Sequence, residues 1–319
     1  MPPLRNRVLL CGHRAFAAQG LAQLLEREGH AVTCFSRGEP GGNASCVTGP
    51  VSELHFNRLV GPGYDTIVNY IVLRHESVEH NLDYLHALLE TCLRCAVQHV
   101  IHVSSVSAYR DDVSLYTTDA PTKADFKHSG PYAALKIAAD QYLMAHLPQT
   151  VKLSLVRPAC VLGENHPDPV GSVGWPLGSG KILVLGNASR IRPVVCRDVL
   201  NRVIARLVAD PPGNSREVLL VVDRNSPTCR EYLQACCDLL GVGTGVVDRP
   251  PPFWIAALLK RELRNGRPAF SMQRFVRSVR QRSRRQRYDP ARSEERVGFG
   301  FTADWRQALR GSNVKRASC

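Results

Sequence analysis

The sequence predicts an α/β fold, with a doubly wound parallel sheet covered by helices on both faces and a smaller C-terminal substrate-binding lobe. Three observations lead to this prediction. Apolar, strand-like segments alternate with amphipathic helical segments over the first half of the 319-residue chain. The strand-like segments are apolar on both faces, as in a sheet buried between two helical layers. The first strand, glycine turn, helix and strand are complete within about thirty residues.

The expected elements follow one another in a regular order. Leu21, Leu24 and Leu25 recur at helical spacing before Gly29, which predicts a first helix over residues 15–29. The expected strands cover residues 6–11, 30–37, 65–72, 99–105 and 151–158, and further helices cover about 77–96 and 132–146. Strand-like and helical pieces return at 191–207 and 217–222. In such a sheet, ligands bind at the carboxyl ends of the strands.

The same pattern divides the chain into two regions. Residues 1–165, with returning elements at about 191–223, form the expected sheet domain, and residues 166–319 form mainly the substrate-binding lobe. The net charge of +13 is concentrated in residues 260–287, with eleven Lys and Arg against one Glu. Three interpretations of this segment are open: a solvated helix or loop, a lid that collects anionic substrates, or a binding site for nucleic acid or an anionic membrane. No nucleic-acid motif accompanies it, and we expect no nucleic-acid partner.

Composition and cysteine usage favour a cytoplasmic protein. No apolar run reaches the roughly 20 residues of a membrane-spanning helix, so no stable membrane insertion is expected. The eleven cysteines are scattered from Cys11 to Cys319, which fits buried reduced thiols better than a disulfide framework. Cys92 and Cys95 form a CxxC without a second pair at zinc-finger spacing, so no metal site is expected.

The turn "GHRAFAAQG" after the first strand is a candidate dinucleotide-binding turn. Gly12 stands where the chain must bend, while Ala15 and Ala18 occupy the two further glycine positions of a GxxGxxG pattern. The second strand ends in Ser36-Arg37 in place of an acidic residue, which favours NADP over NAD. Arg14 could join them at a 2′-phosphate, and Arg37 could equally be one more exposed arginine.

A tyrosine and a lysine four residues apart form the candidate reaction centre. Tyr132 and Lys136 share one face of the expected helix over 132–146. A tyrosine with a pKa near 10 is a poor base at neutral pH and needs a nearby cation. Serines of "HVSSVSAY" follow a central strand, at the edge where the site should lie. The three groups together indicate acid/base chemistry at a substrate oxygen.

With these motifs in place, the sequence resembles the extended short-chain dehydrogenase/reductase superfamily, in its NAD-dependent epimerase/dehydratase branch. The resemblance rests on the Gly12 turn, "HVIHVSSVSAY", "YAALK", "VRPACVLG", "GNASRIRPVVCRDVL" and "YDPARSEERVGFGF". It implies a Rossmann-type fold and a homodimer. It also implies that Ser105 is the catalytic hydroxyl, Tyr132 the acid/base and Lys136 its partner on the cofactor ribose. The further residues that it implies are Phe16 and Tyr70 for the cofactor, and Asn81, Ser107, Arg190 and Arg192 for the substrate.

Departures from the family narrow the expected reaction. Val106-Ser107 follows Ser105 where 4,6-dehydratases of the family carry Asp-Glu, so dehydration lacks its acid and base. Ser107 also replaces the cysteine associated with 3,5-epimerisation. We therefore expect an enzyme that transfers hydride at a secondary alcohol or ketone of a nucleotide sugar, either as an epimerase or as a net ketoreductase. NADP is the expected cofactor, with NAD as the alternative. The alternatives are a steroid-like or other hydrophobic alcohol, with "PPPFWIAALL" as an apolar lid, and a regulatory protein that binds NADP without turnover.

Overall fold

A computed structural model describes nine stretches of the chain, and the fold rests on these. The described residues are 6–36, 46–48, 63–124, 130–166, 175–177, 181–185, 187–240, 246–249 and 286–311. The basic segment up to residue 285, the apolar segment 250–259 and Arg37 lie outside the described residues, so the predictions for them stay predictions.

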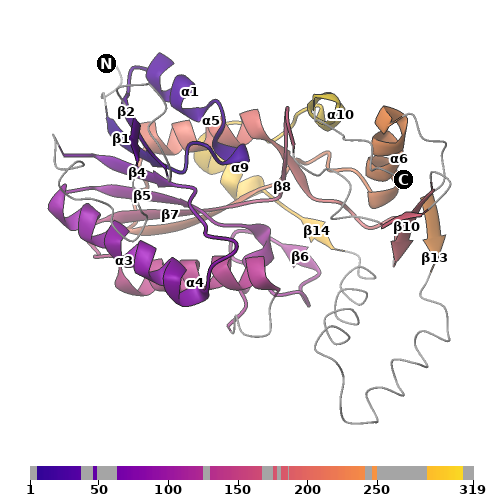
Figure 1. Ribbon diagram of the computed structural model, residues 1–319, viewed down its shortest axis with the longest axis horizontal. Coiled ribbons are helices and arrows are strands. Elements are labelled where there is room, and N and C mark those ends of the chain that lie inside the picture. Colours follow the sequence, from indigo (N-terminus) through magenta and orange to yellow (C-terminus); the bar gives the residue numbers. More distant parts are fainter. Residues whose placement is uncertain are drawn as a thin grey trace, which may run out of the picture.

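A seven-stranded parallel sheet forms the centre of the molecule (Figure 1). Its order is β12-β7-β5-β4-β1-β2-β3, and every neighbouring pair is parallel. The strands are β1 (Arg7–Cys11), β2 (Ala31–Ser36), β3 (Cys46–Thr48), β4 (Thr66–Asn69), β5 (His99–Val103), β7 (Lys152–Pro158) and β12 (Arg216–Val221). This is the doubly wound, Rossmann-type arrangement that the sequence predicts, and the strand order reverses between β1 and β4.

Helices cover both faces of the sheet (Figure 1). One layer contains α3 (Val78–Arg94) and α4 (Pro131–His146), which pack against each other, and the other contains α1 (Leu21–Arg27), α5 (Arg197–Ala209) and α9 (Ala291–Val297). The residues of β1 alternate between them: Val8 and Leu10 join the core under α1 and α5, and Leu9 and Cys11 join the core under α3 and α4. This explains why the four residues of β1 after the exposed Arg7 are all apolar.

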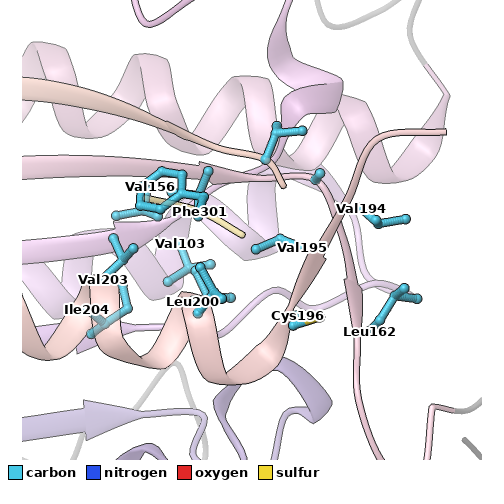
Figure 2. Close-up of a cluster of buried hydrophobic side chains, with 14 of the residues drawn as sticks. Val103, Val156, Leu162, Val194, Val195, Cys196, Leu200, Val203, Ile204 and Phe301 are labelled. Atoms are coloured by element: carbon cyan, nitrogen blue, oxygen red, sulfur yellow. The ribbon is translucent and has the colours of Figure 1, made fainter. Parts of the chain in front are cut away.

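The larger core lies between the sheet and α5 (Figure 2). Leu200, Val203 and Ile204 recur at helical spacing on α5 and face Val103 and Val156 of the sheet in Figure 2. The pair β8 (Cys160–Leu162) and β11 (Val194–Cys196) extends this core toward the carboxyl edge of the sheet.

The remaining elements belong to smaller units. β9 (Trp175–Leu177), β10 (Lys181–Leu185) and β13 (Val246–Arg249) form a three-stranded sheet, which lies with α6 (Cys229–Leu240) at one end of the molecule in Figure 1. β6 (Leu115–Tyr116) pairs with β14 (Arg287–Tyr288).

The last described segment returns to the central sheet. α9 packs against β12, where the Ser293 hydroxyl accepts a hydrogen bond of 2.9 Å from the Leu220 amide. Phe301 and, on α10 (Trp305–Arg310), Trp305 and Leu309 are buried in the core under α5. The division at residue 165 stays a prediction, and residues 291–311 contribute to the same core as the sheet.

The predicted helix over residues 15–29 is wrong in its continuity. The structure has a single 3₁₀ turn, η1 (Phe16–Ala18), followed by Gly20 with φ +83° and then by α1. Because Gly20 adopts the left-handed conformation, it ends the first turn and starts α1 in a new direction. The apolar spacing of Leu21, Leu24 and Leu25 correctly indicates only the second piece.

Candidate active site

A cleft of about 1280 Å³ opens at the carboxyl edge of the sheet. Its walls come from the ends of neighbouring strands: Gly12 after β1, Ser36 at the end of β2, Tyr70 after β4, Ser105 after β5 and Pro158 at the end of β7. The strand order reverses within this set, between β1 and β4. The cleft therefore lies at the topological switch point, where open α/β sheets bind their ligands.

The turn after β1 brings the backbone close to the end of β4. Gly12 has φ +84°, and a Cβ placed on it would lie 3.0 Å from Cγ1 and 3.2 Å from the amide nitrogen of Ile71. Its own amide donates to the Phe35 carbonyl at 2.8 Å, and its carbonyl accepts from the Ala15 amide at 2.8 Å. Only glycine fits this conformation and this approach without strain. Ala15 lines the cleft, whereas Ala18 is buried in the core.

Unsatisfied polar atoms lie along the same wall of the cleft. The hydroxyls of Ser36 and Tyr70 are buried and have no hydrogen-bond partner among the described residues. Arg14 and Phe16 also line this part, and Arg14 is exposed. A buried hydroxyl without a partner is costly unless a ligand or water satisfies it. A bent glycine turn, two such hydroxyls and an arginine fit the ribose and phosphate groups of a dinucleotide.

The predicted triad comes together in the cleft. Tyr132 and Lys136 project from the first turns of α4, which begins with Gly130 at its N-cap and Pro131 at its first position. Ser105 follows β5 and forms a side-chain hydrogen bond with Tyr132. Its hydroxyl also accepts a hydrogen bond of 3.1 Å from the Ser107 amide. The sequence prediction that these three residues share one site is consistent with this geometry.

The cation in contact with the phenol is an arginine that the sequence pattern does not indicate. Burial raises the pKa of Tyr132, and the charge of Arg74 and hydrogen bonds with Ser105 and Arg74 oppose this rise. The Arg74 guanidinium carbon lies 5.0 Å from the centroid of the Tyr132 ring. Lys136 instead directs its ammonium to the Val103 carbonyl at 2.6 Å. Burial lowers the pKa of Lys136 to about 8, which the neighbouring Asp140 opposes.

A buried ion pair lies one helical turn after Lys136, between α4 and β7. Asp140, one helical turn after Lys136, accepts hydrogen bonds of 3.1 and 2.9 Å from Nε and Nη2 of Arg157 on β7. Both side chains are nearly inaccessible, with 5% of Asp140 and 4% of Arg157 exposed. Arg157 also stacks over the Tyr109 ring at 4.7 Å. The pair ties α4 to the sheet directly beneath the reaction centre, and sequence reasoning missed it.

Some of the predicted substrate residues also line the cleft. Ser107 and Arg192 line it together with Cys160, and Nη2 of Arg192 lies 3.2 Å from the Cys160 sulfur. Arg190 is half-buried but does not line the cleft. Asn81 does not line it either, because its amide is bonded to the backbone of Leu73 and Ser77. Cys160 carries no signal in the sequence beyond its position after β7.

Comparisons with known proteins identify the family and the fold of the chain. A profile of the "NAD dependent epimerase/dehydratase family" matches residues 8–194. The chain belongs to this family, which confirms the resemblance seen in its motifs. A search of curated protein sequences finds no match.

Solved structures with low sequence identity share the fold. MoeE5 in complex with UDP-glucose and NAD has a TM-score of 0.69 and 17% identity, over 95% of this chain and 96% of that chain. UDP-glucose 4-epimerase from Bifidobacterium longum in complex with NAD+ and UDP has a TM-score of 0.67 and 15% identity, over 96% of each chain. Human epimerase family protein SDR39U1 with NADPH has a TM-score of 0.59 and 21% identity, over 95% of this chain and 98% of that chain. At these identities the likeness establishes the fold.

The described residues contain no group of three or more His, Cys, Asp or Glu side chains that could hold a metal ion. No helix among them is long and apolar enough to span a bilayer.

Proposed function

We propose that the chain is an NAD(P)-dependent enzyme that transfers hydride at a secondary alcohol or ketone of a nucleotide sugar. The observation that carries this proposal is the meeting of Ser105, Tyr132 and Lys136 in one cleft at the switch point of the sheet, next to the Gly12 turn. A hydroxyl, a phenol and an ammonium in one pocket are the groups that proton transfer to a substrate oxygen requires.

The dinucleotide would be held by the wall that carries the Gly12 turn. Ala15 and Phe16 would approach its pyrophosphate, Tyr70 would lie beside its ribose, and Ser36 with Arg14 would receive a 2′-phosphate. We favour NADP over NAD because Ser36 ends β2 without an acidic side chain in the cleft. Among the cleft-lining residues there is no Asp or Glu, whereas Arg14, Arg74, Lys136 and Arg192 are present.

A nucleotide sugar fits the remaining charge of the cleft. Arg192 and Ser107 both line the cleft, and the Arg192 guanidinium would attract a diphosphate there. The MoeE5 and Bifidobacterium longum structures contain UDP-glucose and UDP, respectively, on the same fold. This similarity supports the proposal that a nucleoside diphosphate sugar is the substrate.

The side chains of the triad divide the work of proton transfer. Tyr132, as phenolate, would take the proton of the substrate hydroxyl during oxidation and return it during reduction. Ser105 would donate a hydrogen bond to the reacting oxygen and hold it close to the phenol. The bound dinucleotide would accept or supply the hydride. Because burial raises the pKa of Tyr132, oxidation should become faster as the pH rises toward that pKa.

Cofactor analysis is the first test of this function. Protein is purified without added nucleotide, one sample is denatured, and the released cofactor is identified by mass spectrometry. A second, native sample is titrated with NADPH and with NADH. Retained NAD that does not exchange would indicate an epimerase and contradict the NADP preference. Exchangeable NADPH would indicate a net ketoreductase. A protein that binds neither dinucleotide would refute the proposal.

The second test removes the phenol. Tyr132→Phe should reduce turnover of a responsive UDP-sugar by at least about 10²-fold and leave cofactor affinity within a few-fold. Tyr142→Phe, on the same helix and outside the cleft, is the matched control and should retain activity. Chromatographic separation of epimers and the absorbance of the reduced cofactor report both reactions. Full activity of Tyr132→Phe would show that Tyr132 is not the acid/base and would point to a different reaction centre.

Two further expectations accompany the proposed function. A homodimer through α3 and α4 is supported by the exposed apolar side chains of Leu93 (63%) and Met144 (44%) on these helices. Light scattering after gel filtration would test it. A cytoplasmic location is supported by the free thiols of the described cysteines, which are typical of a reducing compartment.

A further inference from the structure

The loop between β4 and α3 carries Arg74 into the cleft, over the ring of Tyr132. The guanidinium carbon lies 5.0 Å from the ring centroid, in a cation–π contact with the ring. Arg74 is exposed on its solvent side and lines the cleft on its inner side. No salt bridge ties it to a carboxylate among the described residues. Its charge is therefore directed at the phenol and at the open cleft.

Two buried asparagines hold the loop that presents Arg74. The side-chain amide of Asn81 accepts from the Leu73 amide at 2.9 Å and donates to the Leu73 carbonyl at 3.1 Å. Asn69 accepts from the Ile71 amide at 3.0 Å and from the Tyr84 hydroxyl at 2.8 Å. The backbone on the N-terminal side of Arg74 is thus fixed to the sheet and to α3, which holds the loop where the guanidinium can reach the Tyr132 ring.

Other groups around the phenol come from several elements. Ser105, after the end of β5, lowers the pKa of Tyr132, and the Cys160 thiol on β8 raises it. Lys136, on the same helix as Tyr132, is hydrogen-bonded to the Val103 carbonyl and interacts with Asp140. Because burial lowers the pKa of Lys136 to about 8, its positive charge fades in the alkaline range. A guanidinium stays charged throughout that range.

We propose that Arg74, from the β4–α3 loop, is a positioning residue that stabilises the phenolate of Tyr132, whereas the Lys136 ammonium is directed to the Val103 carbonyl. This inference rests on the proposed function, since it concerns the acid/base group of that reaction. Arg74 acts through Tyr132 by its positive charge over the ring. It also explains how the phenol can ionise while the Lys136 ammonium is directed to a backbone carbonyl.

The expected effect follows from the distance and the exposure of the arginine. An opposite charge within about 4–6 Å shifts the pKa of a group by about 1–3 pH units, and solvent reduces this for an exposed partner. We therefore expect Arg74→Gln to raise the ionisation midpoint of Tyr132 by about one pH unit. The oxidation rate measured below that midpoint should fall about tenfold, because the phenolate fraction falls tenfold.

The test measures the ionisation of the Tyr132 phenol directly, in the absence of substrate. Protein with ¹³C-labelled tyrosine is titrated by NMR, and the Tyr132 resonance is identified by its loss in Tyr132→Phe. Arg74→Gln should shift the midpoint upward, Arg74→Lys should restore most of the shift, and His75→Gln, an exposed neighbour on the same loop, should leave it unchanged. The rate–pH profile of oxidation should move by the same amount as the midpoint.

The outcomes separate this inference from the proposed function. An identical Tyr132 midpoint in Arg74→Gln and wild type would overturn the role of Arg74, even where Tyr132→Phe abolishes turnover. A raised KM with an unchanged midpoint and rate–pH profile would also overturn it, and would assign Arg74 to a substrate anion. Should the midpoint lie above the accessible pH, an oxidation rate in Arg74→Gln equal to wild type at each pH would overturn it. Activity in Tyr132→Phe would refute the proposed function itself.

Discussion

Replacing Lys136 with methionine should stabilise the fold at neutral pH while removing a group of the reaction centre. Only 3% of Lys136 is exposed, and burial lowers its pKa from 10.5 to about 8. Keeping the ammonium charged in the folded state at pH 7 therefore costs about 3 kcal/mol. Methionine has a similar length and no charge, but it leaves the Val103 carbonyl without a donor, which costs about 1–2 kcal/mol. The net expectation is a gain of about 1–2 kcal/mol at pH 7.

The pH dependence separates the charge from the packing. Because the pKa of Lys136 is lower in the folded than in the unfolded chain, the unfolded chain binds more protons between pH 8 and pH 10.5. The stability contributed by this residue therefore rises through that interval in the wild type. Lys136→Met has no such group, so the difference in unfolding free energy should change by about 3 kcal/mol over the interval, in favour of the wild type.

Urea unfolding followed by circular dichroism at several pH values between neutral and pH 10.5 measures this difference. Lys152→Met, which removes a partly buried lysine from β7, controls for the loss of one positive charge. Taking the difference between variant and wild type cancels the other titrating groups. A difference that stays constant from neutral pH to pH 10.5 would refute the reasoning, because the ammonium would then carry no burial penalty.

Three further predictions concern the cleft and its support. Gly12→Ala should lower the free energy of unfolding by at least about 1–2 kcal/mol, because φ is +84° and the added Cβ would lie 3.0 Å from Ile71. Thermal unfolding and dinucleotide titration measure the effect, and wild-type values in both would contradict it. Ser36→Asp should shift the ratio of NADPH to NADH affinity toward NADH by about tenfold or more, since a carboxylate repels a 2′-phosphate; an unchanged ratio of dissociation constants would place the adenosine ribose elsewhere. Asp140→Asn should cost about 3–5 kcal/mol in urea unfolding, because it leaves Arg157 buried without its anion, and a loss below about 1 kcal/mol would show that the pair is dispensable.

Most strands of the sheet can be predicted from the sequence because they are short apolar runs, whereas the three-residue strand β3 (Cys46–Thr48) is missed. Val8 and Leu10 face one helical layer and Leu9 and Cys11 the other, so β1 needs apolar residues at these four consecutive positions. A run of this kind followed by a glycine has few other interpretations. The predicted strands at 30–37, 65–72, 99–105 and 151–158 are confirmed as β2, β4, β5 and β7, with differences of a few residues at their ends.

Other parts of the fold depend on contacts that a local pattern does not contain. The break at Gly20 is invisible to apolar spacing, because Leu21, Leu24 and Leu25 fit a long helix and a short one equally well. The return of residues 291–311 to the sheet depends on Phe301 and Trp305 finding the core under α5, far earlier in the chain. Apolar residues predict that a segment is buried, but they do not predict which part of the core it packs against.

The reaction centre shows the same limit at the level of single side chains. Helical spacing correctly places Tyr132 and Lys136 on one face, because the i and i+4 positions are neighbours on any α-helix. Spacing does not fix where a long side chain ends, and the ammonium of Lys136 ends at Val103 on β5. The cation over the phenol, Arg74, comes from the loop after β4, which borders α4 only because β4 and β5 are adjacent in the sheet order. Pairs that share an element can be found from sequence, whereas pairs created by strand order require the fold. An arginine in a strand-to-helix loop at the switch point is therefore a candidate partner for a catalytic phenol even where the sequence already offers a lysine.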